Sequence, residues 1–391
     1  MKRPLLIFLI AGESSGDFLG ASLMRALRSQ RPDIEFIGVG GGRMAAAGLK
    51  SLFPMEELSV MGIAEVLPKL LHILARIRQT ANEIIKTRPD AVITIDSPDF
   101  CFRVVKKVKQ KTKSIPCIHY VAPSVWAWRP GRAKKVAQFL DHMLTLLPFE
   151  PPYFEKHGLS STFVGHSIVE RMAQRGDGAR FRRKYGITES QMILCMLPGS
   201  RMSELSRLLG KFSETADIIL HSRPDAVIVV PTLPHLRKYI EKFFVGKGIN
   251  PILVDQDEDK FDCFAASSIA LAASGTVSLE LALTDTPHII AYKMSRFSAW
   301  LARHLIKTPY ANLINILLNR SVVPELLQEQ CEPEAMAQEL LKLLENKDAR
   351  TAQLVDFRAA LIQIGLGDPV SPSQKAARAV LSVIDEAGGT A

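Results

Sequence analysis

Short apolar segments alternate with longer helical patterns along most of the chain, and this alternation restricts the fold more than any other feature. Repeated strand and helix units of this kind form a parallel sheet that is covered by helices on both faces. In the first half of the chain we expect strands at residues 5–10, 36–39, 91–95, 115–121 and 142–147. In the second half we expect strands at residues 192–197, 226–230, 252–254, 269–272 and 288–291.

The two sets of strands predict two domains. A length of 391 residues corresponds to two or three domains at about 150 residues each. The polar, glycine-containing stretch 174–178 interrupts the pattern and is the best linker candidate, so we place the domains at residues 1–173 and 179–364. After about residue 332 only helical patterns remain. The sequence therefore predicts an α/β protein with two doubly wound domains and a helical C-terminal tail.

The overall charge favours an anionic partner, because Lys and Arg exceed Asp and Glu by nine. Nucleic acid, phosphorylated substrates and acidic lipid are all compatible with this charge. The five cysteines are widely spaced and contain no C-x-x-C motif, so we expect neither a disulfide framework nor a zinc site, in keeping with a reducing cytoplasm. No apolar stretch reaches the roughly 18 residues that a membrane span needs.

The loop after the first expected strand, residues 11–17, is a candidate binding loop. Gly12 allows the backbone to approach a ligand, and the amino end of the following helix attracts a phosphate or a hydroxyl-rich group. Glu13 and Ser15 are the candidate side chains. The alternative is a tight turn in which Ser15 or Asp17 caps the helix.

A second candidate follows the strand at residues 91–95. Ser97 as a helix cap, Pro98 in the first turn and Asp99 near the helix dipole have ordinary structural explanations. Asp96 has none, and a carboxylate at the carboxyl end of a strand suits a general base. A buried structural aspartate is the alternative.

The second half of the chain opens with a similar turn at Gly199, Ser200 and Arg201, followed by Glu204. Backbone N–H groups, a hydroxyl and a guanidinium together match what a pyrophosphate needs. We therefore interpret this turn as a pyrophosphate-binding site.

The segment at residues 273–280 repeats the arrangement of strand, glycine turn and helix start. Ser274, Gly275 and Thr276 form the turn, and Glu280 lies one helical turn beyond Thr276. These groups can share a face and bind phosphate and ribose. The alternative is a capped helix with a solvated glutamate.

Asp255 and Asp257 resemble the D-x-D motif by which some sugar-nucleotide enzymes hold a divalent metal. They lie in an acidic run, where a solvated loop is the better interpretation. We therefore predict no metal.

Two segments are candidates for contact with lipid or acyl chains. Trp126 and Trp128 lie beside Arg129, an arrangement that suits a sugar or lipid surface but also ordinary packing. Apolar residues between 66 and 77 cover a helical arc of about 160°, which is compatible with a core face or a membrane face. The members of this arc that we select are Val66, Leu67, Leu70 and Leu74.

Taken together and in order, these motifs resemble the lipid-A-disaccharide synthases, bacterial enzymes of the glycosyltransferase B structural class. The tryptophan segment is the most specific of the matches, because no general structural need dictates it. The matching stretches are residues 11–17, 60–62, 96–100, 119–121, 123–129, 147–150, 165–166, 197–201 and 273–276.

The resemblance implies two Rossmann-like domains. Residues 1–173, joined by C-terminal helices at about 365–391, would bind the acceptor, and residues 179–364 would bind the UDP donor. It also implies the reaction, which transfers 2,3-diacylglucosamine from its UDP derivative to 2,3-diacylglucosamine 1-phosphate. The product is a β-1,6-linked disaccharide 1-phosphate, so the transfer inverts the donor anomer.

The resemblance also assigns roles to residues. Asp96 is the candidate base, with Glu13 as its competitor. Arg201 and Ser200 would offset the charge that grows on UDP, without a metal or any other cofactor. Asn315 matches a family asparagine near the donor, although Ile314 precedes it where the family pattern has proline.

We further expect a cytoplasmic protein that associates peripherally with the anionic surface of the inner membrane, and a homodimer is one option for its assembly. Nucleic acid is not an expected partner, because the sequence contains no dedicated binding motif. Two other functions are alternatives. One is a UDP-sugar glycosyltransferase with a soluble acceptor, and the other is a non-catalytic binder of nucleotide sugars.

Overall fold

The computed structural model describes residues 3–58, 66–174, 176–295, 299–300, 304–306 and 308–389. Within these ranges, side chains are not described at residues 66–70, 172–174, 257–258 and 389. The chain forms two compact units. Unit 1 comprises Met1–Ser167 and Gly367–Ala391, and unit 2 comprises Ile168–Leu366.

Unit 1 is built on a parallel sheet with the strand order β3-β2-β1-β4-β5-β6-β7 over its described residues. The two central strands β1 and β4 are apolar almost throughout, as expected for strands that are covered on both faces. The strands are β1 (Leu5–Ala11), β2 (Ile34–Val39), β3 (Lys50–Ser51), β4 (Ala91–Ile95), β5 (Cys117–Tyr120), β6 (His142–Thr145) and β7 (Ser160–Phe163).

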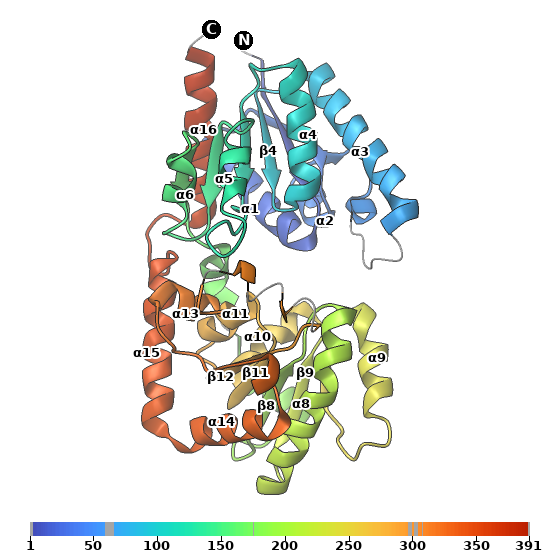
Figure 1. The fold of residues 1–391 in the computed structure, drawn as a ribbon, viewed down its shortest axis with the longest axis vertical. Coiled ribbons are helices and arrows are strands. Elements are labelled where there is room, and N and C mark those ends of the chain that lie inside the picture. Colours follow the sequence, from blue (N-terminus) through green and yellow to red (C-terminus); the bar gives the residue numbers. More distant parts are fainter. Residues whose placement is uncertain are drawn as a thin grey trace. The chain divides into compact units, whose positions relative to one another are not determined.

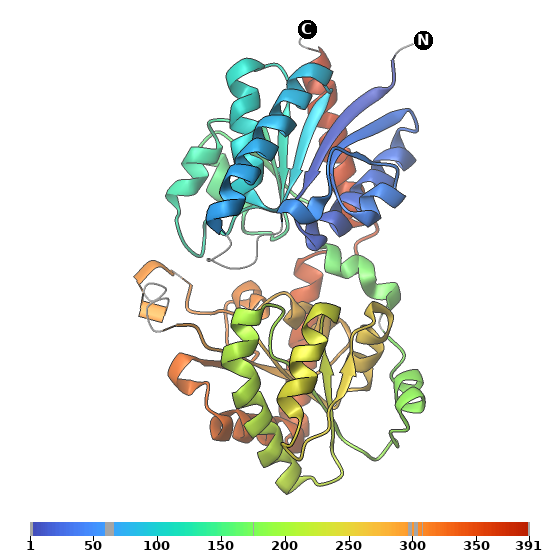
Figure 2. The same ribbon diagram turned by 90° about the vertical axis from the view of Figure 1, so that its right-hand side faces the viewer.

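Helices cover both faces of this sheet (Figures 1 and 2). The helices α1 (Ser14–Gln30) and α16 (Pro372–Gly389) pack on one face, and α3 (Val66–Thr87) and α4 (Pro98–Lys111) pack on the other. Because Ala376, Ala377 and Val380 are buried in the first of these layers, the C-terminal helix is part of the core of unit 1. The shorter helices are η1 (Met55–Leu58), α2 (Gly42–Ala46), α5 (Gly131–Val136) and α6 (Pro151–Glu155).

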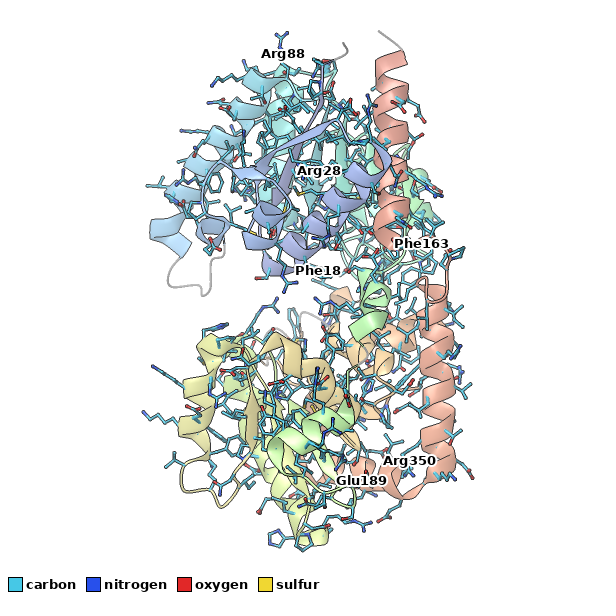
Figure 3. All side chains as sticks on the ribbon, turned by 180° about the vertical axis from the view of Figure 1, so that it is seen from behind. Phe18, Arg28, Arg88, Phe163, Glu189 and Arg350 are labelled. Atoms are coloured by element: carbon cyan, nitrogen blue, oxygen red, sulfur yellow. The ribbon has the colours of Figure 1, made fainter. Side chains whose placement is uncertain are left out.

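Polar contacts from α1 fix the segment that follows β2. The buried carboxylate of Asp17 accepts the backbone N–H groups of Gly41 at 2.8 Å and of Met44 at 3.0 Å, so it caps α2. Arg28, labelled in Figure 3, donates to the carbonyl oxygen of Ala47 at 2.5 Å. These contacts join α1 to α2.

Unit 2 contains a second parallel sheet, whose strands follow the order β10-β9-β8-β11-β12-β13 in the described part of the chain. The strands are β8 (Ile193–Leu197), β9 (Val227–Pro231), β10 (Ile252–Val254), β11 (Ile269–Ala272), β12 (His288–Tyr292) and β13 (Glu325–Leu327). The predicted fold class, with two parallel α/β domains and C-terminal helices, is confirmed.

The helices α8 (Met202–Ser222), α9 (Pro234–Phe244) and α14 (Pro333–Glu345) cover one face of this sheet. The remaining elements are η3 (Ser167–Gln174), α7 (Gly178–Tyr185), α10 (Asp257–Ala266), α11 (Val277–Leu283), α13 (Leu313–Leu318), η4 (Gln328–Gln330) and α15 (Lys347–Gln363). Among the described residues, no helix combines the length and the apolarity that crossing a bilayer requires.

Candidate active site

In unit 1, Asp96 lies at the carboxyl end of β4, as its sequence position predicts. Its carboxylate accepts the hydroxyl hydrogen of Ser15 at 3.3 Å and the backbone N–H of Ser97 at 2.9 Å. Asp96 and Ser97 both have positive φ angles, 53° and 40°. Such backbone strain in residues other than glycine is concentrated at functional sites, so the surrounding structure holds this carboxylate in a defined position.

Gly12 brings the first loop against the end of β4. A Cβ atom at Gly12 would lie 2.6 Å from the hydroxyl oxygen of Ser97, so only glycine fits here without a shift of the neighbouring side chain. Ser15 lies inside α1, and exposed Glu13 is the residue that precedes this helix. The structure therefore brings Gly12, Ser15 and Asp96 together, with Glu13 on the same loop.

The alternative in which Ser15 or Asp17 caps α1 is wrong. Glu13 occupies the N-cap position of α1 and makes no side-chain capping bond, whereas Asp17 caps α2 instead. Ser97 occupies the predicted N-cap position of α4, with Pro98 and Asp99 in the first turn, although its side chain makes no capping bond. Asp99 is 95% exposed and forms an ion pair with Arg132 at 3.4 Å.

His119, at the end of the neighbouring strand β5, is a buried residue that the motif analysis named without a role. Its Nδ1 atom lies 2.7 Å from the hydroxyl oxygen of Thr94 on β4. Burial lowers the pKa of His119 to about 3, so its imidazole is neutral at physiological pH. The contact joins β4 to β5 at Thr94, two residues before Asp96.

In unit 2, a cavity of about 470 Å³ lies at the carboxyl ends of the strands. Its volume falls within the range that is usual for small-molecule sites. The residues predicted from both glycine turns line it together: Gly199, Ser200, Arg201, Glu204, Ser274, Gly275, Thr276 and Glu280.

The turn at Gly199 closes on Glu204, which lies in the first turn of α8. The Glu204 carboxylate accepts the backbone N–H groups of Ser200 at 2.9 Å and Arg201 at 3.3 Å. Gly199 has a φ of 123°, and a Cβ atom at this position would lie 2.5 Å from the Cβ atom of Glu204, so the turn requires glycine here. The carboxylate occupies the two backbone donors and also pairs with the guanidinium of Arg201 at 3.4 Å. That guanidinium is 69% exposed, so it is the charged group of this turn that a ligand can still reach.

The second turn leaves open space at Gly275. A Cβ atom at this position would have no neighbour within 4 Å, so the protein itself does not require glycine here. Ser274 donates its hydroxyl hydrogen to the carbonyl oxygen of Ala311 at 3.2 Å. Thr276 is exposed and precedes α11 without a side-chain capping bond, so the capped-helix alternative is wrong.

Glu280 is not a solvated glutamate, because its side chain is only 14% exposed. One carboxylate oxygen accepts a hydrogen bond from Lys260 at 2.6 Å, and the other lies 3.6 Å from the guanidinium of Arg171. Lys260 also lines the cavity, so it adds a cation that the sequence motifs did not indicate.

Asn315 does not line the cavity. Its amide group is used within unit 2, where Nδ2 donates to the carbonyl oxygen of Val323 and to Glu325, both at 2.8 Å. Its Oδ1 atom accepts the backbone N–H groups of Val322 and Val323. Direct contact between Asn315 and a donor stays a prediction.

The acidic run near residue 255 is described only in part. Asp255 forms an ion pair with Arg237 at 3.1 Å, and the side chain of Asp257 lies outside the described residues. Over the ranges that the structure covers, no group of three or more His, Cys, Asp or Glu side chains could hold a metal ion.

The tryptophan segment has an inner and an outer residue. Trp126 donates from its indole N–H to the buried carboxylate of Glu150 at 3.1 Å and packs edge-on against Phe149. Trp128 is 38% exposed, with the guanidinium of Arg129 over its ring at 4.2 Å. Trp126 is thus held by the protein, whereas Trp128 has a free surface.

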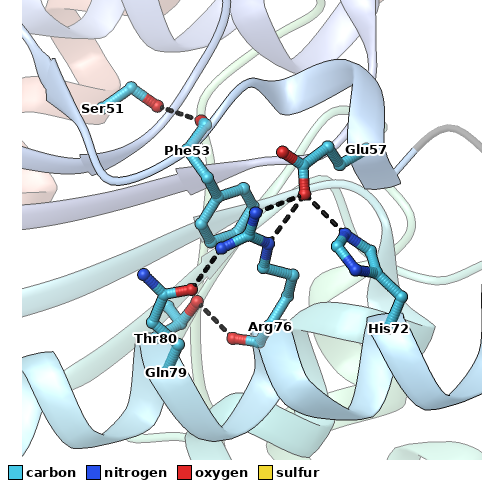
Figure 4. Close-up of polar contacts among 7 residues, drawn as sticks. All are labelled: Ser51, Phe53, Glu57, His72, Arg76, Gln79 and Thr80. Atoms are coloured by element: carbon cyan, nitrogen blue, oxygen red, sulfur yellow. Dashed lines mark hydrogen bonds and ion pairs between the residues drawn. The ribbon is translucent and has the colours of Figure 1, made fainter.

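The helix α3 is attached to unit 1 through both polar and apolar groups. Glu57 accepts hydrogen bonds from His72 at 2.5 Å and from Arg76 at 2.7 Å (Figure 4). On the apolar side Leu74 packs, partly buried, against the core, whereas Leu71 is 75% exposed. The side chains of Val66, Leu67 and Leu70, and the whole motif at residues 60–62, lie outside the described residues.

Comparison with known proteins agrees with the resemblance in the motifs. The family model for lipid-A-disaccharide synthetase matches residues 7–374. Lipid-A-disaccharide synthase from Rhodospirillum centenum is 52% identical over 383 residues, which are 98% of this chain and 95% of that protein. The enzyme of the same name from Pseudomonas savastanoi is 40% identical and covers 99% of both chains.

Solved structures share the fold at low sequence identity. S. aureus MnaA in its structure with UDP has a TM-score of 0.66, with 14% identity over 97% of this chain and 96% of that one. A glycosyltransferase from Rickettsia africae has a TM-score of 0.60, with 11% identity over 99% of both chains. The architecture is therefore that of the glycosyltransferase B class. The two alternative functions, a transferase for a soluble acceptor and a non-catalytic binder, are not favoured. The chain belongs to the lipid-A-disaccharide synthase family and is a UDP-sugar glycosyltransferase that makes the lipid A disaccharide.

Proposed function

We propose that this chain transfers 2,3-diacylglucosamine from UDP-2,3-diacylglucosamine to the 6-hydroxyl of 2,3-diacylglucosamine 1-phosphate. The hydroxyl oxygen forms a bond to the anomeric carbon of the donor while the bond from that carbon to UDP breaks. UDP leaves with the bonding electrons, and the hydroxyl proton goes to a carboxylate of the protein. A single displacement of this kind inverts the anomeric centre, giving a β-1,6-linked product.

Asp96 is the proposed base, and its hydrogen bonds are the observation that carries the proposal. The Ser15 hydroxyl and the Ser97 N–H fix the direction of the carboxylate. In both hydrogen bonds the carboxylate of Asp96 is the acceptor. They hold the carboxylate in an orientation in which it can accept a proton from the substrate hydroxyl. Glu13 is the competing base, because it is exposed on the loop that precedes Ser15. Unit 1 accordingly binds the acceptor.

The cavity of unit 2 is the proposed donor site. Arg201 and Ser200 lie at the amino end of the 21-residue helix α8, where the helix dipole favours a pyrophosphate. As the bond to UDP breaks, the guanidinium stabilises the charge that grows on the leaving oxygen. Ser274, Thr276 and Glu280 bind the remaining polar groups of UDP. No metal takes part in this proposal.

We also propose that the protein acts on the cytoplasmic face of the inner membrane, attached peripherally to its anionic surface. Substrates that carry acyl chains reside in a bilayer, and Leu71 and Trp128 offer exposed apolar surface in unit 1. The proposal extends to a homodimer as the working assembly.

The test is an assay of the purified protein with both acylated substrates, in which the disaccharide is identified by mass spectrometry and UDP release is measured in parallel. We expect one UDP for each disaccharide formed. Turnover with a soluble, unacylated sugar acceptor but not with the acylated one would support the alternative transferase. UDP binding without any turnover would support the non-catalytic binder.

A further inference from the structure

Glu325, the first residue of β13, lies outside the cavity lining and accepts three hydrogen bonds. Its Oε2 atom accepts the backbone N–H of Ala311 at 2.9 Å. Its Oε1 atom accepts the backbone N–H of Asn312 at 2.9 Å and the side-chain amide of Asn315 at 2.8 Å. Hydrogen bonds to an ionised acceptor are stronger than neutral ones, so this carboxylate fixes the segment at residues 311–312.

The fixed segment reaches the cavity through Ala311. The carbonyl oxygen of Ala311 lies 3.2 Å from the hydroxyl oxygen of Ser274, which lines the cavity. A carbonyl group only accepts hydrogen bonds, so the Ser274 hydroxyl must donate its hydrogen to Ala311. Only the lone pairs of the Ser274 oxygen then remain for a ligand, and Ser274 is set as an acceptor.

A second, buried network of hydrogen bonds holds Asn312 of the same segment. Asn312 donates from its side-chain amide to the hydroxyl of Ser278 at 2.7 Å, and that hydroxyl lies 2.7 Å from Nε2 of His288. Nδ1 of His288 lies 3.0 Å from the carbonyl oxygen of Thr286 and must donate to it. Nε2 is therefore the acceptor for Ser278. Burial lowers the pKa of His288 to about 4, in agreement with a neutral ring.

From these contacts we infer that Glu325 is a positioning residue for donor binding. Through Ala311 it keeps the hydroxyl hydrogen of Ser274 turned away from the ligand, and Ser274 accepts a hydrogen bond from a ribose hydroxyl of UDP. A phosphate, which only accepts, is not the partner of Ser274 in this arrangement. The inference rests on the proposed donor site. It adds that Ser274 is the acceptor, and UDP the donor, in the hydrogen bond between them.

The test compares the binding of UDP, 2′-deoxy-UDP and 3′-deoxy-UDP by isothermal titration calorimetry. The wild type should bind one of the two deoxy analogues about tenfold more weakly than UDP, the effect of one well-formed hydrogen bond. Glu325→Gln should bind UDP about tenfold more weakly than the wild type and lose this discrimination. Its amide group places a donor opposite the backbone donors at residues 311–312, so these can no longer both be satisfied.

Glu345→Gln is the matched control, because it removes the same charge from a 64% exposed side chain in unit 2 whose ion pair is with Arg223. It should bind like the wild type. Ser274→Ala is a second variant that leaves Glu325 in place and should also lose the discrimination. Unchanged discrimination in Ser274→Ala overturns the inference, even if Glu325→Gln does not fold. Absence of UDP binding by the wild type would instead reject the proposed donor site.

Discussion

The hydroxyl group of Ser15 donates to the carboxylate of Asp96 at 3.3 Å, although the two residues are 81 positions apart in the chain. They meet because β1 and β4 are adjacent parallel strands, so that the start of α1 and the end of β4 lie at the same edge of the sheet. The close approach also needs Gly12, which leaves room for the side chain of Ser97. The contact gives Asp96 a fixed direction, and direction is what a general base requires.

Asp96→Asn is expected to lower turnover by about 10² to 10⁴, the usual contribution of general acid–base catalysis. The amide has the same shape as the carboxylate but cannot take up the proton of the substrate hydroxyl. UDP binding should be unchanged, because the proposed donor site lies in unit 2. The measurements are the rate of disaccharide formation and the dissociation constant for UDP.

Glu13→Gln is the comparison for this prediction, since it removes the competing carboxylate from the same loop. It should keep most of the turnover. If instead Glu13→Gln shows the large loss and Asp96→Asn is nearly normal, the base is Glu13.

Arg201→Ala is expected to weaken UDP binding and to slow transfer, since the guanidinium is the exposed cation of the Gly199 turn. Helix α8 should persist, because the backbone N–H of residue 201 still bonds to Glu204 in the variant. If Arg201 takes the place of a metal ion, chelators should leave the wild type active. Strict dependence on added Mg²⁺ would contradict this and return attention to Asp255.

Gly275→Ala separates ligand binding from stability. A methyl group at this position would have no protein atom within 4 Å, and the φ of Gly275 is not in the left-handed region. Alanine should therefore keep or slightly raise the melting temperature, because it restricts the unfolded chain. If the donor lies against this glycine, the same methyl group should raise the KM for the UDP-sugar. An unchanged KM would mean that the donor does not approach Gly275.

Glu150 predicts a specific pH dependence of stability. Burial raises the pKa of its carboxyl from 4.5 to about 7, against the opposing effect of hydrogen bonds from Leu147, Trp126 and Leu146. The folded state therefore holds this proton more tightly than the unfolded state does. The stabilisation that protonated Glu150 contributes is full below about pH 4.5, falls as the pH rises to about 7, and is absent above it.

Glu150→Gln removes this titration. The unfolding free energy of the wild type minus that of the variant should therefore fall between pH 5 and 7 and stay level from pH 7.5 to 9. Urea titrations at a series of pH values measure this difference. A difference that does not vary with pH would show that the carboxyl titrates in its ordinary range.

The interior strands of both sheets could be predicted from the sequence, and so could one edge strand, β10, whereas the other three edge strands could not. Strands such as β4 and β11 are buried on both faces and so appear as apolar runs. The strands that the sequence pattern missed, β3, β7 and β13, all lie at sheet edges. An edge strand has one neighbour and keeps polar residues, as in the exposed pair Lys50–Ser51 of β3, so no apolar run marks it.

Some residues of the candidate site could also be predicted from the sequence, and others could not. Residues in the turns after the strands could be found, because glycine turns and strand ends are local features of the sequence. The contacts that Glu325 makes with residues 311–312, and the pairing of Lys260 with Glu280, join positions that are 13 to 20 residues apart. No local pattern encodes such pairs, since they depend on how loops from different strands meet.

Exposed apolar surface on α3 leads to a prediction about membrane binding. Leu71 is 75% exposed, so Leu71→Ser should leave the melting temperature unchanged. The same substitution should reduce sedimentation with anionic vesicles, because each methylene buried in the membrane contributes about 0.8 kcal/mol to binding. Val355→Ser, at a 63% exposed position of unit 2, is the matched control and should sediment like the wild type. Leu74→Ser should lower the melting temperature, because Leu74 packs against the core. If Leu71→Ser sediments like the control, α3 is not the docking helix, and Trp128→Ser becomes the variant that decides whether the tryptophan segment is.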